Sequence, residues 1–122
     1  EETVCPFEIA VAQQLAVAAE GWTEGADPWP TELANLSVFD GPPAELVALI
    51  YDDEVDDAET WSIVWHLDPT NPRGYWIRCR YANTLVTIER QLPAGTRTCE
   101  VTFEKLMSYA DRRPVVRSMR CE

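Results

Sequence analysis

Apolar and polar side chains alternate along residues 75–103, and this alternation constrains the fold more than any other feature of the sequence. It falls into three runs, residues 75–81, 84–92 and 98–104, separated by Ala82-Asn83 and by Pro93-Ala94-Gly95. A period of two is typical of strands that bury one face. Asn and Gly tolerate the positive φ of tight turns, and Pro ends a strand ladder. The pattern therefore predicts a three-stranded antiparallel meander with one apolar face.

Shorter patterns extend this interpretation to the rest of the chain. Residues 7–18 also alternate, which favours a strand, although their alanine content leaves a helix as the alternative. Residues 46–51 are almost wholly apolar, which predicts a buried strand entered through a helical turn at Ala44-Glu45. Further strands are predicted for residues 36–39, 61–67 and 115–121. The predicted fold is all-β, an antiparallel sandwich or flattened barrel of about seven strands.

The length of the chain bounds its organisation. The 122 residues suffice for one domain with a core of its own, and we expect residues 1–122 to form that single domain. No apolar run reaches the roughly 20 residues that a membrane-spanning helix needs, so no membrane span is expected. The chain begins at Glu1, which fits either an exported form whose signal peptide has been removed or a trimmed form of the protein.

Four cysteines in a chain of this size indicate an oxidising compartment and two disulfides. No Cys-x-x-Cys pair occurs and His66 is the only histidine, so we expect no zinc site, no other metal and no cofactor. In the predicted meander, Cys79 and Cys99 would lie about 9.6 Å apart, beyond the ~7 Å limit for a disulfide. Two of the three possible pairings remain, and a C-terminal hairpin that sets Cys99 opposite Cys121 predicts the pairs Cys5–Cys79 and Cys99–Cys121.

The second pair implies a C-terminal hairpin. Residues 98–106 and 114–121 would turn around Tyr109-Ala110-Asp111 and place Cys99 opposite Cys121. The same register would set Glu104 opposite Val116 and Leu106 opposite Pro114.

Charge is divided unevenly along the chain. Residues 1–72 hold 16 acidic and no Lys or Arg residues, whereas residues 73–122 hold 5 acidic and 10 basic ones, giving a net charge of −11. This balance argues against nucleic acid as a partner, because phosphate binding needs a basic face. Two interpretations stay open: the two parts interleave and neutralise each other, or an acidic surface attracts a basic protein partner.

The densest charge lies in residues 52–59. Their spacing lacks the glycine and the alternate oxygen ligands of a calcium-binding loop. A solvated hairpin tip is the simplest interpretation, and a partner-binding loop is the functional one. The candidate partner-binding residues are Asp52, Asp53, Glu54, Asp56, Asp57 and Glu59.

Catalytic chemistry finds little support. His66 has no readable nucleophile or orienting group, and no nucleophile elbow, phosphate loop or metal motif occurs, so no catalytic residue is assigned. Trp22 and Trp29 lie in a loop rich in turn residues, where they either cap the core or form a ligand platform.

Several short motifs resemble those of the STY group, a family of small, uncharacterised bacterial envelope proteins. The motifs are Cys5-Pro6, Gly21-Trp22, Phe39-Asp40-Gly41-Pro42-Pro43, the Tyr75-Trp76-Ile77-Arg78-Cys79-Arg80-Tyr81-Ala82-Asn83-Thr84 run, Leu92-Pro93 and Cys99-Glu100-Val101. The resemblance implies export to the bacterial periplasm. By analogy, the size and cysteines are similar to those of periplasmic immunity proteins and lysozyme inhibitors.

We therefore expect a non-enzymatic periplasmic inhibitor, an immunity protein that blocks a cell-wall hydrolase or toxin. Its partner would be a basic protein. An envelope protein with a structural or small-ligand-binding role is the alternative, and a hydrolase is the least supported one.

Overall fold

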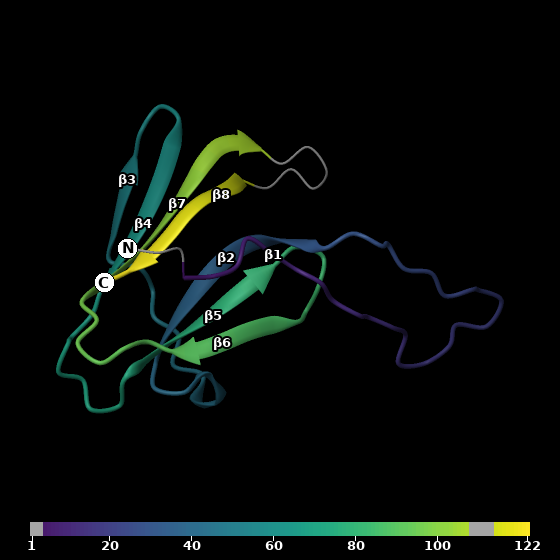
Figure 1. Cartoon of the computed structure of the whole chain (residues 1–122), viewed down its shortest axis with the longest axis horizontal. Coiled ribbons are helices and arrows are strands. Elements are labelled where there is room, and N and C mark those ends of the chain that lie inside the picture. Colours follow the sequence, from purple (N-terminus) through teal and green to yellow (C-terminus); the bar gives the residue numbers. More distant parts are fainter. Residues whose placement is uncertain (1–3, 108–113) are drawn as a thin grey trace.

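The computed structural model describes residues 4–107 and 114–122 (Figure 1). Its strands are β1 (Glu8–Ile9), β2 (Thr31–Asp40), β3 (Asp53–Asp56), β4 (Thr60–His66), β5 (Tyr75–Tyr81), β6 (Thr87–Gln91), β7 (Thr98–Met107) and β8 (Pro114–Cys121). A single 3-10 turn, η1 (Pro43–Glu45), follows β2. The strands form two antiparallel sheets, in the orders β1-β2-β5-β6 and β3-β4-β7-β8. This arrangement confirms the all-β prediction as a sandwich rather than a barrel.

The core lies between the two sheets and is built from the alternation that the sequence predicts. The inward side chains Ile77 and Cys79 of β5 are buried, and so are Cys99, Val101 and Phe103 of β7. Val38 from β2 and Met119 from β8 complete the centre of the cluster. Each large apolar side chain removed from water contributes about 1.5–3 kcal/mol, so this layer stabilises the pairing of the two sheets.

Both disulfides agree with the predicted pairing. Cys5 is bonded to Cys79 and ties the N-terminal segment to β5, while Cys99 is bonded to Cys121 across β7 and β8. The predicted meander that supported the argument is wrong, however. The chain leaves β6 at the sheet edge and crosses to the other sheet, where β7 pairs with β4 and β8. A period-two pattern shows which face of a strand is buried but not which strand lies beside it.

The C-terminal hairpin differs from prediction by one residue of register. Cys99 does face Cys121, but Glu104 faces Val115 rather than Val116, and Pro114 faces Met107 rather than Leu106. Irregularities after Thr102 and after Glu104 cause these shifts, because an extra residue in one strand displaces every later pair. The predicted turn around Tyr109-Ala110-Asp111 lies outside the described residues.

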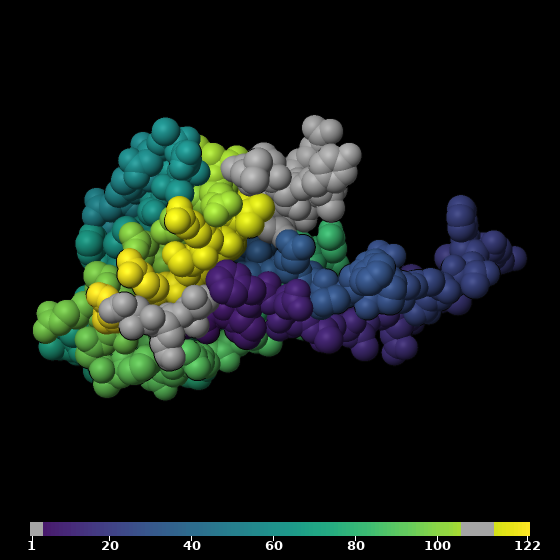
Figure 2. Space-filling model, turned by 45° about the horizontal axis from the view of Figure 1, so that its top comes forward, coloured from purple at the N-terminus to yellow at the C-terminus, as the bar shows by residue number. Residues whose placement is uncertain are grey.

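Two predicted strands are largely absent. Within residues 7–18 only Glu8–Ile9 forms a strand, and residues 10–30 extend away from the sandwich as an arm (Figures 1 and 2). Residues 46–51 make one isolated bridge, Phe39 to Ala48, and their side chains are mostly exposed rather than buried. The helical turn predicted before them corresponds to η1.

Candidate partner-binding surface

Strand β3 carries three of the six predicted acidic residues, and it lies at the edge of its sheet. It pairs with β4 alone, so its other edge faces solvent. Every residue from 52 to 59 is exposed. Asp53, Glu54 and Asp56 belong to the strand itself, which corrects the expectation that the whole run forms a hairpin tip. Asp57, Ala58 and Glu59 form the tip, closed by the Asp57 N–H donating to the Thr60 carbonyl at 2.9 Å.

The pairing register divides these carboxylates between the two faces of the sheet. Glu54 lies opposite Ile63 and Asp56 opposite Trp61, so both acids share the core-facing side of β4. Asp53 is on the outer side, with its carboxylate 2.5 Å from His66 Nε2. Because β3 is the outermost strand, its core-facing acids stay in water. Charges on both faces also keep a free strand edge from pairing with other chains.

His66 is bound by the acidic residues from two directions. Its backbone N–H donates to Asp52 Oδ2 at 2.6 Å, and its ring contacts Asp53. Among residues 4–107 and 114–122, no hydroxyl or thiol group hydrogen-bonds to the imidazole, so this Asp–His pair lacks the nucleophile of a catalytic triad. Asp52 lies 14 positions and Asp53 13 positions before His66 in the sequence. The pairing register of β3 and β4 brings both acids next to the histidine.

Glu54 joins the acidic run to a group of aromatic side chains. Its Oε2 accepts hydrogen bonds from the Trp61 Nε1–H at 3.0 Å and from the Tyr51 hydroxyl at 3.3 Å. The charge of Glu54 raises the pKa of Tyr51, with smaller contributions from desolvation and the hydrogen bond. The Tyr51 ring is nearly perpendicular to the rings of Trp61 and Trp65, at centroid distances of 6.4 Å. We call residues 51–59 together with Trp61 the acidic surface.

An apolar segment leads into this surface. In residues 46–51, the side chains of Leu46 and Ile50 are 77% and 86% exposed. Leu46 also has a φ of 63°, a conformation that is unfavourable for a residue with a Cβ atom. The segment is fixed rather than loose, because the Leu49 N–H donates to the Val38 carbonyl and the Leu49 carbonyl accepts from Trp65 Nε1. A fixed apolar segment beside an acidic strand is suited to contact with another protein.

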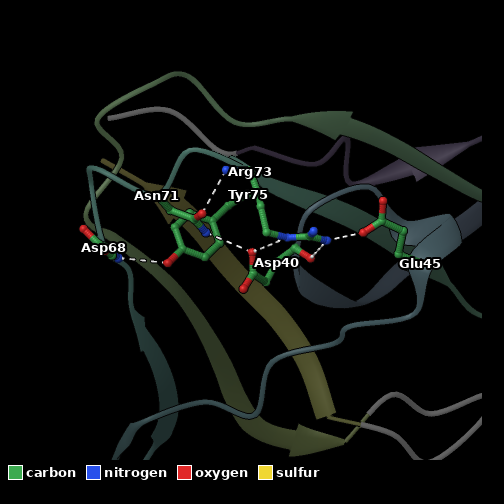
Figure 3. Close-up of polar contacts among 6 residues, drawn as sticks. All are labelled: Asp40, Glu45, Asp68, Asn71, Arg73 and Tyr75. Atoms are coloured by element: carbon green, nitrogen blue, oxygen red, sulfur yellow. Dashed lines mark hydrogen bonds and ion pairs between the residues drawn. The ribbon is translucent and has the colours of Figure 1, made fainter.

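Figure 3 shows the polar cluster that holds the start of this segment. Arg73 lies between Asp40, at 3.3 Å, and Glu45 of η1, and the hydrogen bond to Glu45 is the main cause of its raised pKa. Asn71 donates to Asp40 at 2.9 Å. Each charge in this cluster already has a partner within the chain. We therefore interpret the cluster as structural.

The loop that contains Asn71 is fixed by Asp68 and Tyr75. The Asp68 N–H donates to the Tyr75 hydroxyl at 3.0 Å (Figure 3). The side chain and backbone of Thr70 both donate to the Asp68 carboxylate, and these hydrogen bonds lower its pKa.

Positive charge is sparse around the acidic surface. Lys105 forms an ion pair with Asp56, and His66 contacts Asp53. The side chains of Asp57 and Glu59 make no polar contact with the described residues. Within the same residues, no group of His, Cys, Asp and Glu is arranged to hold a metal ion. The surface thus keeps a net negative charge that is available to a positively charged partner.

Residues 27–122 match the family model of the type VI secretion system Tli immunity protein. The chain belongs to this family. As a Tli immunity protein it blocks a toxin, which confirms the function predicted from the sequence. The match does not confirm the STY-group resemblance itself. No curated protein and no solved structure matches the chain.

The match covers the whole acidic surface, whereas most of the arm lies before it. None of the helices in the described part of this Tli protein could cross a membrane. For Trp22 and Trp29 the sequence allowed two interpretations, a cap on the core or a ligand platform. Both side chains lie outside the core.

Proposed function

We propose that this Tli immunity protein acts in the periplasm as a non-enzymatic inhibitor that binds its toxin through the acidic surface. The toxin would be a basic protein, and a cell-wall hydrolase is the class we expect. The observation that carries the proposal is the exposed run of carboxylates on β3 and the loops beside it, in contact with Tyr51 and Trp61.

Two physical properties support binding at this surface. An acidic surface accelerates encounter with a basic partner and excludes acidic ones. Tyr and Trp are enriched among the residues that dominate binding energy, and Tyr51 and Trp61 are already held in place by Glu54. Because these rings are ordered before binding, less conformational entropy is lost when the toxin docks.

The proposed location and the absence of catalysis rest on separate features. Two disulfides fit an oxidising compartment such as the bacterial periplasm. Within the described part of the chain no nucleophile hydrogen-bonds to His66, and the side chains of Asp53 and His66 are both more than half exposed to water. An inhibitor of this kind acts by occupying a surface of the toxin and needs no reactive group.

Association kinetics with the toxin that the protein blocks test the proposal. The variant Asp52→Asn/Asp53→Asn/Asp56→Asn/Asp57→Asn should associate roughly tenfold more slowly at low salt and show a weaker salt dependence. The matched control removes four charges elsewhere, at Glu8, Glu32, Glu89 and Glu122, by substitution with Gln. Equal kinetics for the two variants would exclude the acidic surface as the docking site.

A further inference from the structure

The arm, residues 10–30, is held at its base and free along most of its length. Ile9 at the end of β1 pairs with Thr31 at the start of β2, so the two ends of the arm lie side by side. The Leu33 N–H donates to the Phe7 carbonyl at 2.7 Å just below this point. The Cys5–Cys79 disulfide then fixes the incoming strand to β5. The base of the arm is therefore part of the rigid sandwich.

Beyond its base the arm makes few contacts with the sandwich. Gln13 hydrogen-bonds to the Asn83 carbonyl and to the Thr84 hydroxyl, both in the β5–β6 connection. The tip reverses direction in a turn where the Trp22 N–H donates to the Ala19 carbonyl at 3.1 Å and Gly21 has a φ of 85°. The arm projects clear of the body in Figure 2.

The exposed side chains of the arm are apolar to an unusual degree. Trp22 is 83% exposed and Trp29 is 78% exposed, and Leu15 and Val17 are exposed as well. Tryptophan is highly buried on average, so two tryptophans in water on one projecting element indicate a binding element. The charges of the arm are the carboxylates of Glu20, Glu24 and Asp27, and it has no Lys or Arg.

Shape and charge select the kind of surface that could receive this arm. A narrow projection fits a concave site better than a flat one, and apolar tips need an apolar floor. The three carboxylates require a basic rim and are repelled by anionic lipid headgroups. A cleft in a basic protein meets these requirements, and a basic protein is the toxin class proposed above.

We propose that the arm inserts into a cleft of the toxin, with Trp22 and Trp29 as its anchors. This inference rests on the proposed function, because it assumes that the protein binds a basic toxin. The matched family region begins at residue 27, so the tip with Trp22 lies outside the part shared with the family.

The pairing of Ile9 with Thr31 permits a clean deletion. An Asn-Gly turn can join two directly opposite residues of a hairpin, so residues 10–30 can be replaced by Asn-Gly without disturbing the sandwich. A second variant, Trp22→Ser/Trp29→Ser, keeps the arm and removes the anchors. Leu85→Ser is the matched control, because Leu85 is 99% exposed and lies outside the arm.

Isothermal titration with the toxin that the protein blocks provides the readout. Both arm variants should keep the wild-type melting temperature and lose at least about thirtyfold in affinity. Leu85→Ser should bind within about twofold of wild type. Acrylamide should quench the fluorescence of Trp22 and Trp29 in the free protein, and bound toxin should reduce this quenching.

Four results would overturn the inference. Wild-type affinity in both arm variants would overturn the inference about the arm but leave the proposed function intact. Failure of the wild-type protein to bind the toxin would overturn both the inference and the proposed function. Arm-dependent sedimentation with vesicles of phosphatidylethanolamine and phosphatidylglycerol, without arm-dependent toxin binding, would assign the arm to a membrane. Arm-dependent dimerisation in the ultracentrifuge, again without toxin binding, would assign it to a second copy of the chain.

Discussion

Trp65 of β4 and Trp76 of β5 belong to different sheets of the sandwich and differ in burial. Trp65 is 4% exposed, and its Nε1–H donates to the carbonyl of Leu49, which packs against the core. Trp76 lies on the outer face of β5, half-buried and opposite Phe39. The alternation in the sequence predicted this difference, because burial on one face is a local property of each strand.

This difference predicts unequal costs of truncation. Trp65→Ala should lower the free energy of unfolding by about 3–5 kcal/mol, because it leaves a cavity and an unpaired carbonyl. Trp76→Ala should cost about 1–2 kcal/mol, since only part of that ring leaves water on folding. Urea unfolding measures both. Equal, large losses would show that the outer face of β5 is as well covered as the core.

A small effect on stability is expected for substitution of Leu46, because its side chain is exposed and its backbone is left-handed. Leu46→Gly should change the free energy of unfolding by no more than about 1 kcal/mol, since relief of strain offsets the added entropy of the unfolded chain. The same variant should bind the toxin more weakly, as an exposed apolar contact is lost. A stability loss as large as that of Trp65→Ala would contradict our description of the segment.

At the scale of elements, strands were predictable where their alternating apolar side chains are buried in the core. Residues 75–81 and 98–104 bury the faces that their alternation indicates. The prediction for residues 46–51 was wrong, because an exposed apolar run has the same sequence pattern as a run buried in a core. The strand predicted for residues 7–18 was wrong for a related reason. The alternating alanines of the arm offer too little apolar surface to hold a strand against the sandwich.

The candidate site, too, could be predicted only in part from the sequence. The sequence located the six carboxylates and suggested their exposure, but it could not place His66 beside Asp53 or Glu54 beside Trp61. Those contacts depend on the register between β3 and β4, which only the folded sheet defines.

The two disulfides should differ in their effect on stability. Cys5–Cys79 closes 74 residues and Cys99–Cys121 closes 22. In the chain-entropy model, their removal by paired Cys→Ala substitution costs about 4.5 and about 3.4 kcal/mol respectively. Chemical unfolding of the two double variants tests the order. A larger loss at Cys99–Cys121 would mean that native contacts, rather than loop closure, dominate.

At the scale of the whole molecule, the uneven charge of the sequence is redistributed by the fold. Each sheet takes two strands from the acidic first part and two from the basic second part. Ion pairs join the two parts, as between Asp56 and Lys105 and between Asp40 and Arg73. The two parts therefore interleave, as one of the two interpretations of the sequence proposed, and the ion pairs between them leave the acidic surface negative.

Amide hydrogen exchange of the protein with and without its toxin tests the central claim most directly, because it maps every covered segment at once. We predict slower exchange in the complex for peptides that cover residues 46–61, with β6 unchanged as an internal reference. Unaltered exchange throughout residues 46–61, in a complex that forms and blocks the toxin, would contradict the claim that the acidic surface is where the toxin binds.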